Sequence, residues 1–490
     1  MRPAWIAFAT LGGPLLAATL GLPGTACRKQ PDVRSETPAD VTPLPPPPVD
    51  AGEAPDATLA SPAAPDAPPP VDAPPPPDAD VAEATAPDGT EAAPPPVAEA
   101  APLTEEESRV VAAAAAGLAG DLYPRLAKDR TNMAFSPTSL LLALAMTSGG
   151  ARGETAAQMN AVLHLGDDPD RARELLGRAQ RRLIATSSET ARIAIANRLF
   201  GEKSYTFAPE FLDWAAAQFA APLEPVDFRH AFEAARDRIN AWVKEQTRDR
   251  IPEILPQGSV DSGTRLVLTN AIWFKGRWLV RFEEQETRPQ PFTLANGAAV
   301  NVPMMVRNGR MRYAERDGVQ LLELPYDGEE LSLFVVLPPA GEAPDPWLTA
   351  EHLAGLDRLP KWEVDVRLPR FKIDPPQPVQ IAEDLAELGM PRAFDQDRAE
   401  FEGIAAAPSD QGRLCISAVF HRAFVEVNEE GTEAAASTAV VMVFGGAGSG
   451  PNRPRPVRFH ADHPFLFLIR DNRTGLILFV GRVGDPRAAA

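Results

Sequence analysis

The 490-residue sequence lacks the motifs of most enzymes, metal sites and nucleic-acid-binding proteins. It has two cysteines and six histidines, and none of them has the spacing of a metal-binding motif. A Gly-x-Ser-x-Gly motif and a phosphate-binding loop ending in Gly-Lys-Ser/Thr are both absent. The net charge of −19 gives no sign of a basic nucleic-acid-binding surface. We therefore expect no catalytic residues, no metal, no cofactor and no nucleic-acid partner. A surface enzyme stays an alternative, because catalytic triads are recognised by geometry.

Proline is abundant, but it is concentrated in one segment. Residues 28–102 hold 22 of the 53 prolines and no aromatic residue, and they carry 14 acidic against 3 basic residues. Such a segment cannot bury enough apolar surface to offset the entropy cost of ordering, so we predict a disordered tether. A solvated spacer and a specific acidic docking segment are the two interpretations of its function.

Residues 1–27 have the pattern of an export signal. An apolar run from Ala4 to Leu22 is broken by two glycines and a proline, and small residues then lead to Cys27. This ending resembles the cleavage site of a bacterial lipoprotein, although Gly24 stands where that motif usually has Leu. Acylation of Cys27 would anchor the protein outside the cytoplasm, at a bacterial membrane or cell surface. Plain secretion and an uncleaved membrane helix are the alternatives.

The second cysteine, Cys415, lies in an apolar run and is expected to be a buried thiol rather than a reactive nucleophile. If Cys27 is acylated, no disulfide can form within the chain. The folded part, residues 103–490, must then depend on its hydrophobic core alone.

The folded part begins with helical patterns and continues with strand patterns. Thr104 and Glu107 form a capping-box motif, and Ser136-Pro137 has the pattern of a helix start. Helices are expected at 110–126, 140–146, 154–163, 170–184, 208–218 and 231–246. Strands are expected at 132–135, 266–273, 300–313, 319–325, 331–337, 362–373, 413–427, 457–459, 465–470 and 476–480. Helices followed by strands, with no internal repeat, predict an α+β fold.

The most informative segment follows the strand pattern that ends near Val427. It reads Glu429-Glu430-Gly431-Thr432-Glu433-Ala434-Ala435-Ala436-Ser437-Thr438. Side chains this small would clash little if the segment entered a β-sheet as an extra strand. Composition alone also fits a simple alanine-rich linker.

This segment resembles the proximal hinge of inhibitory serpins, and the resemblance covers essentially the whole folded part. Further serpin-like motifs are Asn132–Ser139, Ile239–Val243, Thr269–Trp278, Leu388–Met390 with Ala393–Phe394, and Ala461–Ile469. Several motifs in the right order are far more specific than any one alone. The resemblance implies helices packed around a large central sheet A, with sheets B and C and an exposed reactive-centre loop.

The resemblance also implies roles for single residues. Ser136, Ser139, Asn270 and His421 correspond to the shutter, a polar cluster beneath the point where sheet A opens. Trp278 and Glu429 correspond to the region where the loop first enters that sheet. In the family, a protease cleaves the loop and is trapped as an acyl-enzyme when the hinge inserts into the sheet. The small hinge residues, without proline or a basic residue, favour an inhibitor over a non-inhibitory surface binding protein.

The position of the cleaved bond is less well defined. The family's usual spacing from the hinge places it at Gly445–Gly446, or at Phe444–Gly445 if the loop is one residue shorter. Phe444 suits a chymotrypsin- or subtilisin-like protease, whereas Val443 or Ala447 would suit an elastase-like one. No Arg or Lys lies between residues 429 and 451, which argues against trypsin-like targets. The expected partners are serine proteases, with cysteine proteases as a second class, and the inhibitor is expected to be a monomer.

Overall fold

The computed structural model describes residues 101–488, except 186–187, 189, 222, 354, 407–411 and 433–454. The described residues all belong to one compact unit, Gly89–Ala490. The export signal, Cys27 and nearly all of the tether lie outside them. Those assignments, and the boundary at residue 103, therefore stay predictions.

The helices begin where the local sequence predicts. Thr104 accepts a hydrogen bond from the backbone of Glu107, whose side chain bonds back to the Thr104 backbone, and this capping box starts the first helix. Ser136 caps the second helix, with Pro137 in its first turn. The helices are α1 (Glu105–Ala127), α2 (Pro137–Gly149), α3 (Gly153–Val162), α4 (Pro169–Ala185), α5 (Pro209–Phe219), α6 (Phe228–Gln246), α7 (Ala350–Leu353) and α8 (Ala382–Leu388).

The strands of the main sheet come from distant parts of the chain. In spatial order they are β11 (Phe371–Ile373), β14 (Ala418–Val427), β15 (Gly431–Thr432), β5 (Leu266–Arg277), β2 (Ala191–Glu202) and β4 (Glu224–Val226), and β12 (Val379–Gln380) also pairs with β14. Strand β5 lies antiparallel to β2 and parallel to β14. This is the predicted sheet A.

A second sheet of nine strands is built around a long central strand, β7 (Ala299–Arg316). Its order is β1 (Met133–Phe135), β18 (Ile477–Val483), β17 (Phe465–Asp471), β9 (Leu331–Leu337), β8 (Val319–Pro325), β7, β10 (Lys361–Pro369) and β16 (Val457–His460), and β6 (Arg288–Thr293) pairs with β7. The predicted sheets B and C are joined here, because β7 pairs with β6 at its start, with β10 along its middle and with β8 at its end. A short pair, β3 (Thr206–Phe207) and β13 (Ala405–Ala406), lies apart.

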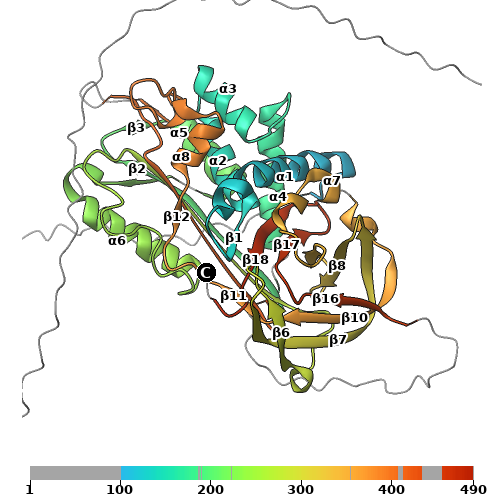
Figure 1. Ribbon diagram of the computed structural model, residues 1–490. Coiled ribbons are helices and arrows are strands. Elements are labelled where there is room, and N and C mark those ends of the chain that lie inside the picture. The colour runs from blue at the N-terminus through green and yellow to red at the C-terminus, as the bar shows by residue number, and fades with distance from the viewer. Residues whose placement is uncertain are drawn as a thin grey trace, which may run out of the picture. The chain divides into compact units, whose positions relative to one another are not determined.

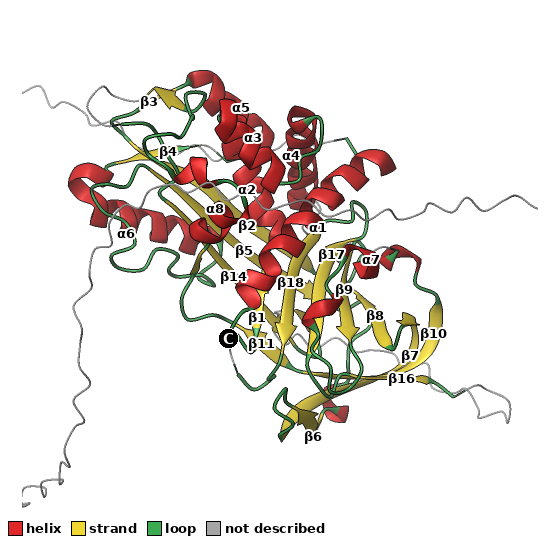
Figure 2. Ribbon diagram, turned by 45° about the horizontal axis from the view of Figure 1, so that its top comes forward, coloured by secondary structure: helices red, strands yellow, loops and turns green. Residues whose placement is uncertain are grey.

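Helices cover both faces of the main sheet (Figures 1 and 2). Helix α2 is almost entirely buried, and it packs against β5 and β2 on one side and against β18 of the second sheet on the other. Helix α6 crosses the opposite face, where Ile239 and Val243 join a core with Ala196, Val267 and Ala271. Near the β15 end this face stays part-exposed at Arg192, Ala194 and Lys275, so a strand added there meets packed side chains mainly on the α2 face.

The sequence prediction missed one central strand, β2. Its segment contains alanines that favour a helix. Pairing with β5 along eleven residues, from Ala191 to Gly201, makes it a strand instead. Two predicted strands differ from the structure: β14 begins at Ala418 rather than at 413, and the single strand predicted at 362–373 is divided at Arg370 into β10 of the second sheet and β11 of the main sheet. The other predicted helices and strands agree with the structure to within a few residues. Cys415, just before β14, is buried as expected, and burial raises the pKa of its thiol to about 11.

Candidate functional site

The seam between β5 and β14 runs through the middle of the main sheet. The two strands pair in parallel from Val267–Ala418 to Trp273–Phe424. Over this length the pairing is direct, so no strand lies between them. Beyond Phe424 the strands diverge, and β15 occupies the space between them. An added strand would have to break the direct pairing from that end.

Beneath the seam, four predicted shutter residues form a buried polar network. His421 and Asn270 are register partners on β14 and β5, and the Nδ1 of His421 hydrogen-bonds to the Oδ1 of Asn270. The Nε2 of His421 accepts a hydrogen bond of 3.0 Å from the backbone N–H of Ser136. These two contacts assign the neutral tautomer with the proton on Nδ1. The backbone N–H of Ser139 donates to the Ser136 hydroxyl.

A fifth member of the network, Asn197, was not predicted. Its Oδ1 accepts a hydrogen bond of 2.7 Å from Asn270, and its Nδ2 donates to the carbonyl of Ser139 at 2.9 Å. The second donor hydrogen of Asn270 reaches the Ser139 hydroxyl at 2.7 Å. Asn197 lies on β2 opposite Asn270, so it was missed together with its strand. The network thus ties β14, β5, β2 and the start of α2 together.

Burial decides the charge of His421. Its side chain is enclosed, and this loss of solvation lowers its pKa to about 3. The imidazole is therefore neutral at physiological pH. Both ring nitrogens have partners, so the buried polar group is satisfied and adds to the stability of the closed seam.

At the open end of the seam, the first hinge residues already lie in the sheet. Gly431 pairs with Arg277 of β5, and Thr432 pairs with both Gly276 of β5 and Val427 of β14. Thr432 is completely buried. The hinge is therefore not a free linker at this point: its first two residues form β15.

Two stacked aromatic side chains, Trp278 and Tyr326, contact β15 and the residues just before it. The rings of Trp278 and Tyr326 are parallel, with centroids 4.6 Å apart. The indole N–H of Trp278 donates to the carbonyl of Asn428 at 2.9 Å, and its backbone N–H donates to the carbonyl of Glu430 at 2.9 Å. The hydroxyl groups of Tyr326 and Thr432 lie 2.6 Å apart and share a hydrogen bond. Burial raises the pKa of Tyr326, so this hydroxyl stays protonated.

Charged residues hold the chain just before β15. The Glu429 carboxylate is only 3% exposed, and the Nε of Arg370 donates to both of its oxygens at 2.7 Å. The hydroxyl of Thr287 donates to the same carboxylate. Glu430 forms an ion pair with Arg281 at 2.9 Å. The carboxylate is enclosed while the Arg370 side chain is 41% exposed, so this pair lies between a surface ion pair and a buried one in strength.

The structure thus brings the predicted site residues together in two places. Ser136, Ser139, Asn270 and His421 meet beneath the seam, and Trp278, Glu429, Gly431 and Thr432 meet at its open end. Sequence reasoning missed Asn197, Tyr326, Arg370 and Thr287, because each reaches the site from a segment distant in sequence. The remaining predicted residues, Glu433, Ala434, Ala435, Ala436, Ser437 and Thr438 of the hinge and Phe444, Gly445 and Gly446 at the cleaved bond, lie outside the described residues.

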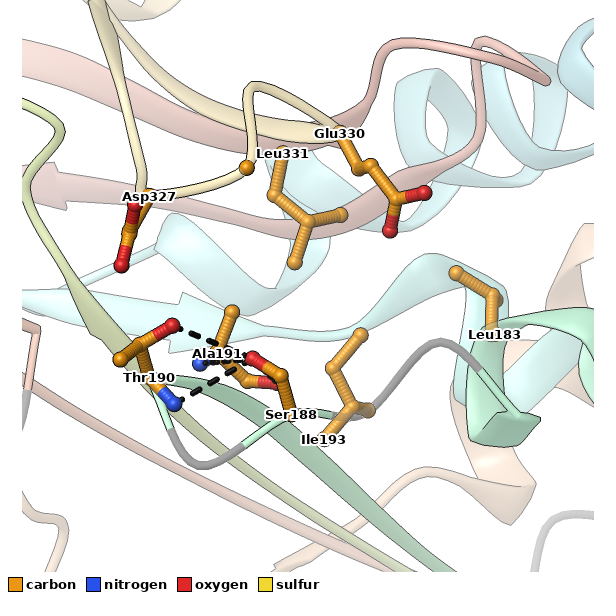
Figure 3. A pocket seen from close by; sticks show the side chains of 9 residues that line it. Leu183, Ser188, Thr190, Ala191, Ile193, Asp327, Glu330 and Leu331 are labelled. Carbon is orange, nitrogen blue, oxygen red and sulfur yellow. Dashed lines mark hydrogen bonds between the residues drawn. The ribbon is translucent and has the colours of Figure 1, made fainter.

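A pocket lies beside the start of β2 (Figure 3). It is lined by Leu183, Ser188, Thr190, Ala191, Ile193, Asp327, Gly328, Glu330 and Leu331. The Ser188 hydroxyl accepts hydrogen bonds from the backbone of Thr190 and Ala191, and Glu330 is paired with Arg473. This lining includes no histidine or cysteine to act as a base or a thiol nucleophile.

Comparison with known proteins gives one consistent result. The family model described as "Serpin (serine protease inhibitor)" matches residues 113–486. Human leukocyte elastase inhibitor is 40% identical over 382 residues, which cover 75% of this chain and 97% of that protein. Mouse antithrombin-III is 36% identical over 380 residues, covering 75% and 80%. The crystal structure of tengpin, a thermophilic serpin, in its native state superposes with a TM-score of 0.69 at 28% identity, covering 79% of this chain and 97% of tengpin.

The depressed pKa of His421 predicts a loss of stability in mild acid. The unfolded chain takes up a proton near the ordinary histidine pKa of about 6.5, whereas the folded chain resists protonation down to about 3. The stabilisation is therefore present above about 6.5 and declines as the pH falls, by about 2 kcal/mol at pH 5. The thermal midpoint, measured between pH 7.5 and 5, should fall more steeply for the wild type than for His421→Gln. Parallel pH profiles for the two proteins would contradict this.

The Glu429–Arg370 pair predicts a second effect on stability. Arg370→Gln leaves the buried Glu429 carboxylate without its cation, which should destabilise the protein by about 1–2 kcal/mol, because Arg370 is 41% exposed, and speed its unfolding in urea. The double variant Arg370→Gln/Glu429→Gln removes both charges, so it should recover part of the loss. If the loss of unfolding free energy in the double variant equals the sum of the losses in the two single variants, the two side chains are not coupled and the prediction is wrong.

Proposed function

The chain belongs to the serpin family, and we propose that it inhibits serine proteases as a suicide substrate rather than catalysing a reaction. Relatives named as elastase inhibitor and antithrombin support a protease as the partner. Cysteine proteases are a second class of target. A non-inhibitory serpin-fold binding protein is the alternative function.

In the proposed mechanism, a protease attacks the loop that follows Thr432 and forms an acyl-enzyme. Cleavage frees the hinge, which then inserts between β5 and β14 as a new strand. Loop insertion in serpins is an established case of strand addition and of strain released by cleavage. The attached protease is carried along and distorted before the acyl bond is hydrolysed. The uncleaved state persists because opening the seam is slow.

The observation that carries this proposal is the position of β15. Gly431 and Thr432 already pair with β5, while the seam below them stays closed by direct pairing of β5 with β14. Apart from Glu433, the sequence that follows, as far as Ser437, contains only small residues. Extending β15 with Thr432, Ala434 and Ala436 on the inner face would add a strand without forcing large side chains into the core.

The target preference rests on the loop sequence. Cleavage at Phe444–Gly445 suits a chymotrypsin- or subtilisin-like protease, and cleavage next to Val443 or Ala447 suits an elastase-like one. The 40% identity to a leukocyte elastase inhibitor supports the elastase-like choice. The absence of Arg and Lys from residues 431–450 argues against trypsin-like targets.

We place the inhibitor outside the cytoplasm, as a monomer held by a lipid on Cys27 and carried on the tether of residues 28–102. The export-signal pattern of residues 1–27 supports this location. Among the described residues, no helix has the length and apolar character needed to cross a membrane. Plain secretion is the alternative to the lipid anchor.

Mixing the protein with chymotrypsin, elastase and subtilisin tests the function. At least one of these proteases should give a covalent band that survives SDS, together with a cleaved loop that mass spectrometry locates within residues 442–447. The cleaved protein should melt at a higher temperature than the intact one, because insertion completes the sheet. Cleavage without a covalent band or a rise in melting temperature would favour the non-inhibitory alternative.

Thr432 offers a test of the insertion step. Its side chain is completely buried between strands, so Thr432→Arg should block insertion while leaving the loop cleavable. This variant should be cleaved at the wild-type rate but form at least tenfold less covalent complex. The control Thr432→Ser keeps a small hydroxyl and should inhibit like the wild type. Full inhibition by Thr432→Arg would rule out insertion as the mechanism.

A further inference from the structure

Two glycines allow the hinge to approach the sheet closely at β15. A Cβ atom on Gly431, whose φ is +154°, would lie 1.9 Å from the carbonyl oxygen of Gly276. A Cβ on Gly276 would lie 2.8 Å from the ring of Tyr326. Because neither position has a side chain, the hinge packs directly against β5. Thr432, the register partner of Gly276, then reaches the Tyr326 hydroxyl.

This contact matters because the register decides which side chains enter the core. Neighbouring residues of a strand face opposite sides, so a slip by one residue exchanges the two faces. If Thr432 faces Tyr326 and the core, then every second residue after it, Ala434 and Ala436, would face the core as well. A slip by one residue would instead turn Glu433 toward the core, where its charge is costly to bury. Only one of the two registers is therefore compatible with a buried strand.

We infer that Tyr326 is a positioning residue, which holds the hinge in its productive register through the hydroxyl of Thr432 before any protease arrives. The inference rests on the proposed inhibitory function. After cleavage, insertion competes with hydrolysis of the acyl-enzyme. A hinge whose first residue is already in register can extend at once, whereas a released hinge must first find its register. Tyr326 thereby sets the fraction of encounters that end in a trapped protease.

Three variants isolate this hydrogen bond. Tyr326→Phe removes the hydroxyl and keeps the ring that stacks on Trp278. Thr432→Val removes the other hydroxyl with little change in volume, and the double variant removes both. Tyr123→Phe is the matched control. Tyr123 lies on α1, away from the seam, and it is a buried tyrosine whose hydroxyl hydrogen-bonds to Asp345.

The main measurement is the number of inhibitor molecules consumed for each protease trapped. We expect each single variant to raise the ratio of cleaved inhibitor to covalent complex by about two- to tenfold, the range expected for one lost hydrogen bond. The rate of loop cleavage should stay unchanged, since the contact does not touch the protease. The double variant should resemble either single variant, because both lose the same bond.

Three outcomes would overturn the inference. The first is an unchanged ratio in Tyr326→Phe. The second is an equal rise in Tyr123→Phe, which would show a general effect of stability. The third is an additive effect in the double variant, which would show that the two hydroxyls do not act as a pair.

A second measurement needs no protease and separates this inference from the proposed function. Hydrogen exchange of a peptide spanning residues 428–432 should be about two- to tenfold faster in Tyr326→Phe and Thr432→Val than in the wild type or Tyr123→Phe. If the wild type traps no protease but exchange rises as expected, the inhibitory function fails while the contact still positions the hinge. Unchanged exchange would overturn the positioning contact itself.

Discussion

Strands β14 and β5 pair directly with each other from Ala418 to Phe424 of β14. Beyond Phe424, Gly431 and Thr432 lie between the same two strands. The main sheet is thus closed over most of its length and already extended at one end. An added strand brings new backbone hydrogen bonds to a sheet. Here those bonds can form only after the existing hydrogen bonds between the parallel strands β5 and β14 have broken. The balance between these two processes underlies the fold and its proposed activity.

The closed part of the seam is held by more than backbone pairing. His421, Asn270 and Asn197 lie side by side on three neighbouring strands, and their side chains bond to one another and to the start of α2. A buried network of this kind is stabilising only while every member has a partner. Separating β14 from β5 must break the His421–Asn270 contact, so the network opposes opening at the point where a new strand would have to pass.

The open end of the seam is organised differently, by contacts from segments far apart in the chain. Arg370 pairs with Glu429 just before β15, and Trp278 binds the backbone carbonyls of Asn428 and Glu430 on either side of Glu429. Tyr326 reaches Thr432, the completely buried residue of β15. These contacts fix where the hinge enters, whereas the small residues that follow decide how far it can extend. Entry and extension are therefore governed by different parts of the sequence.

Local sequence determined much of this protein. Capping residues such as Ser136 and Thr104 placed helix starts, alternating patterns placed most strands, and several motifs in the right order carried the resemblance to the family and to its shutter. Tertiary structure decided the rest. The segment of β2 became a strand through pairing with β5, and Asn197 joined the network only as a consequence. No local pattern marks Tyr326 or Arg370 as part of the site, because their roles depend on register and approach between segments distant in sequence. Helix caps and small side chains have their effect on residues a few positions away, so the sequence reveals them. Which strands pair, and in which register, depends on contacts between residues far apart in the sequence, which form only in the folded chain.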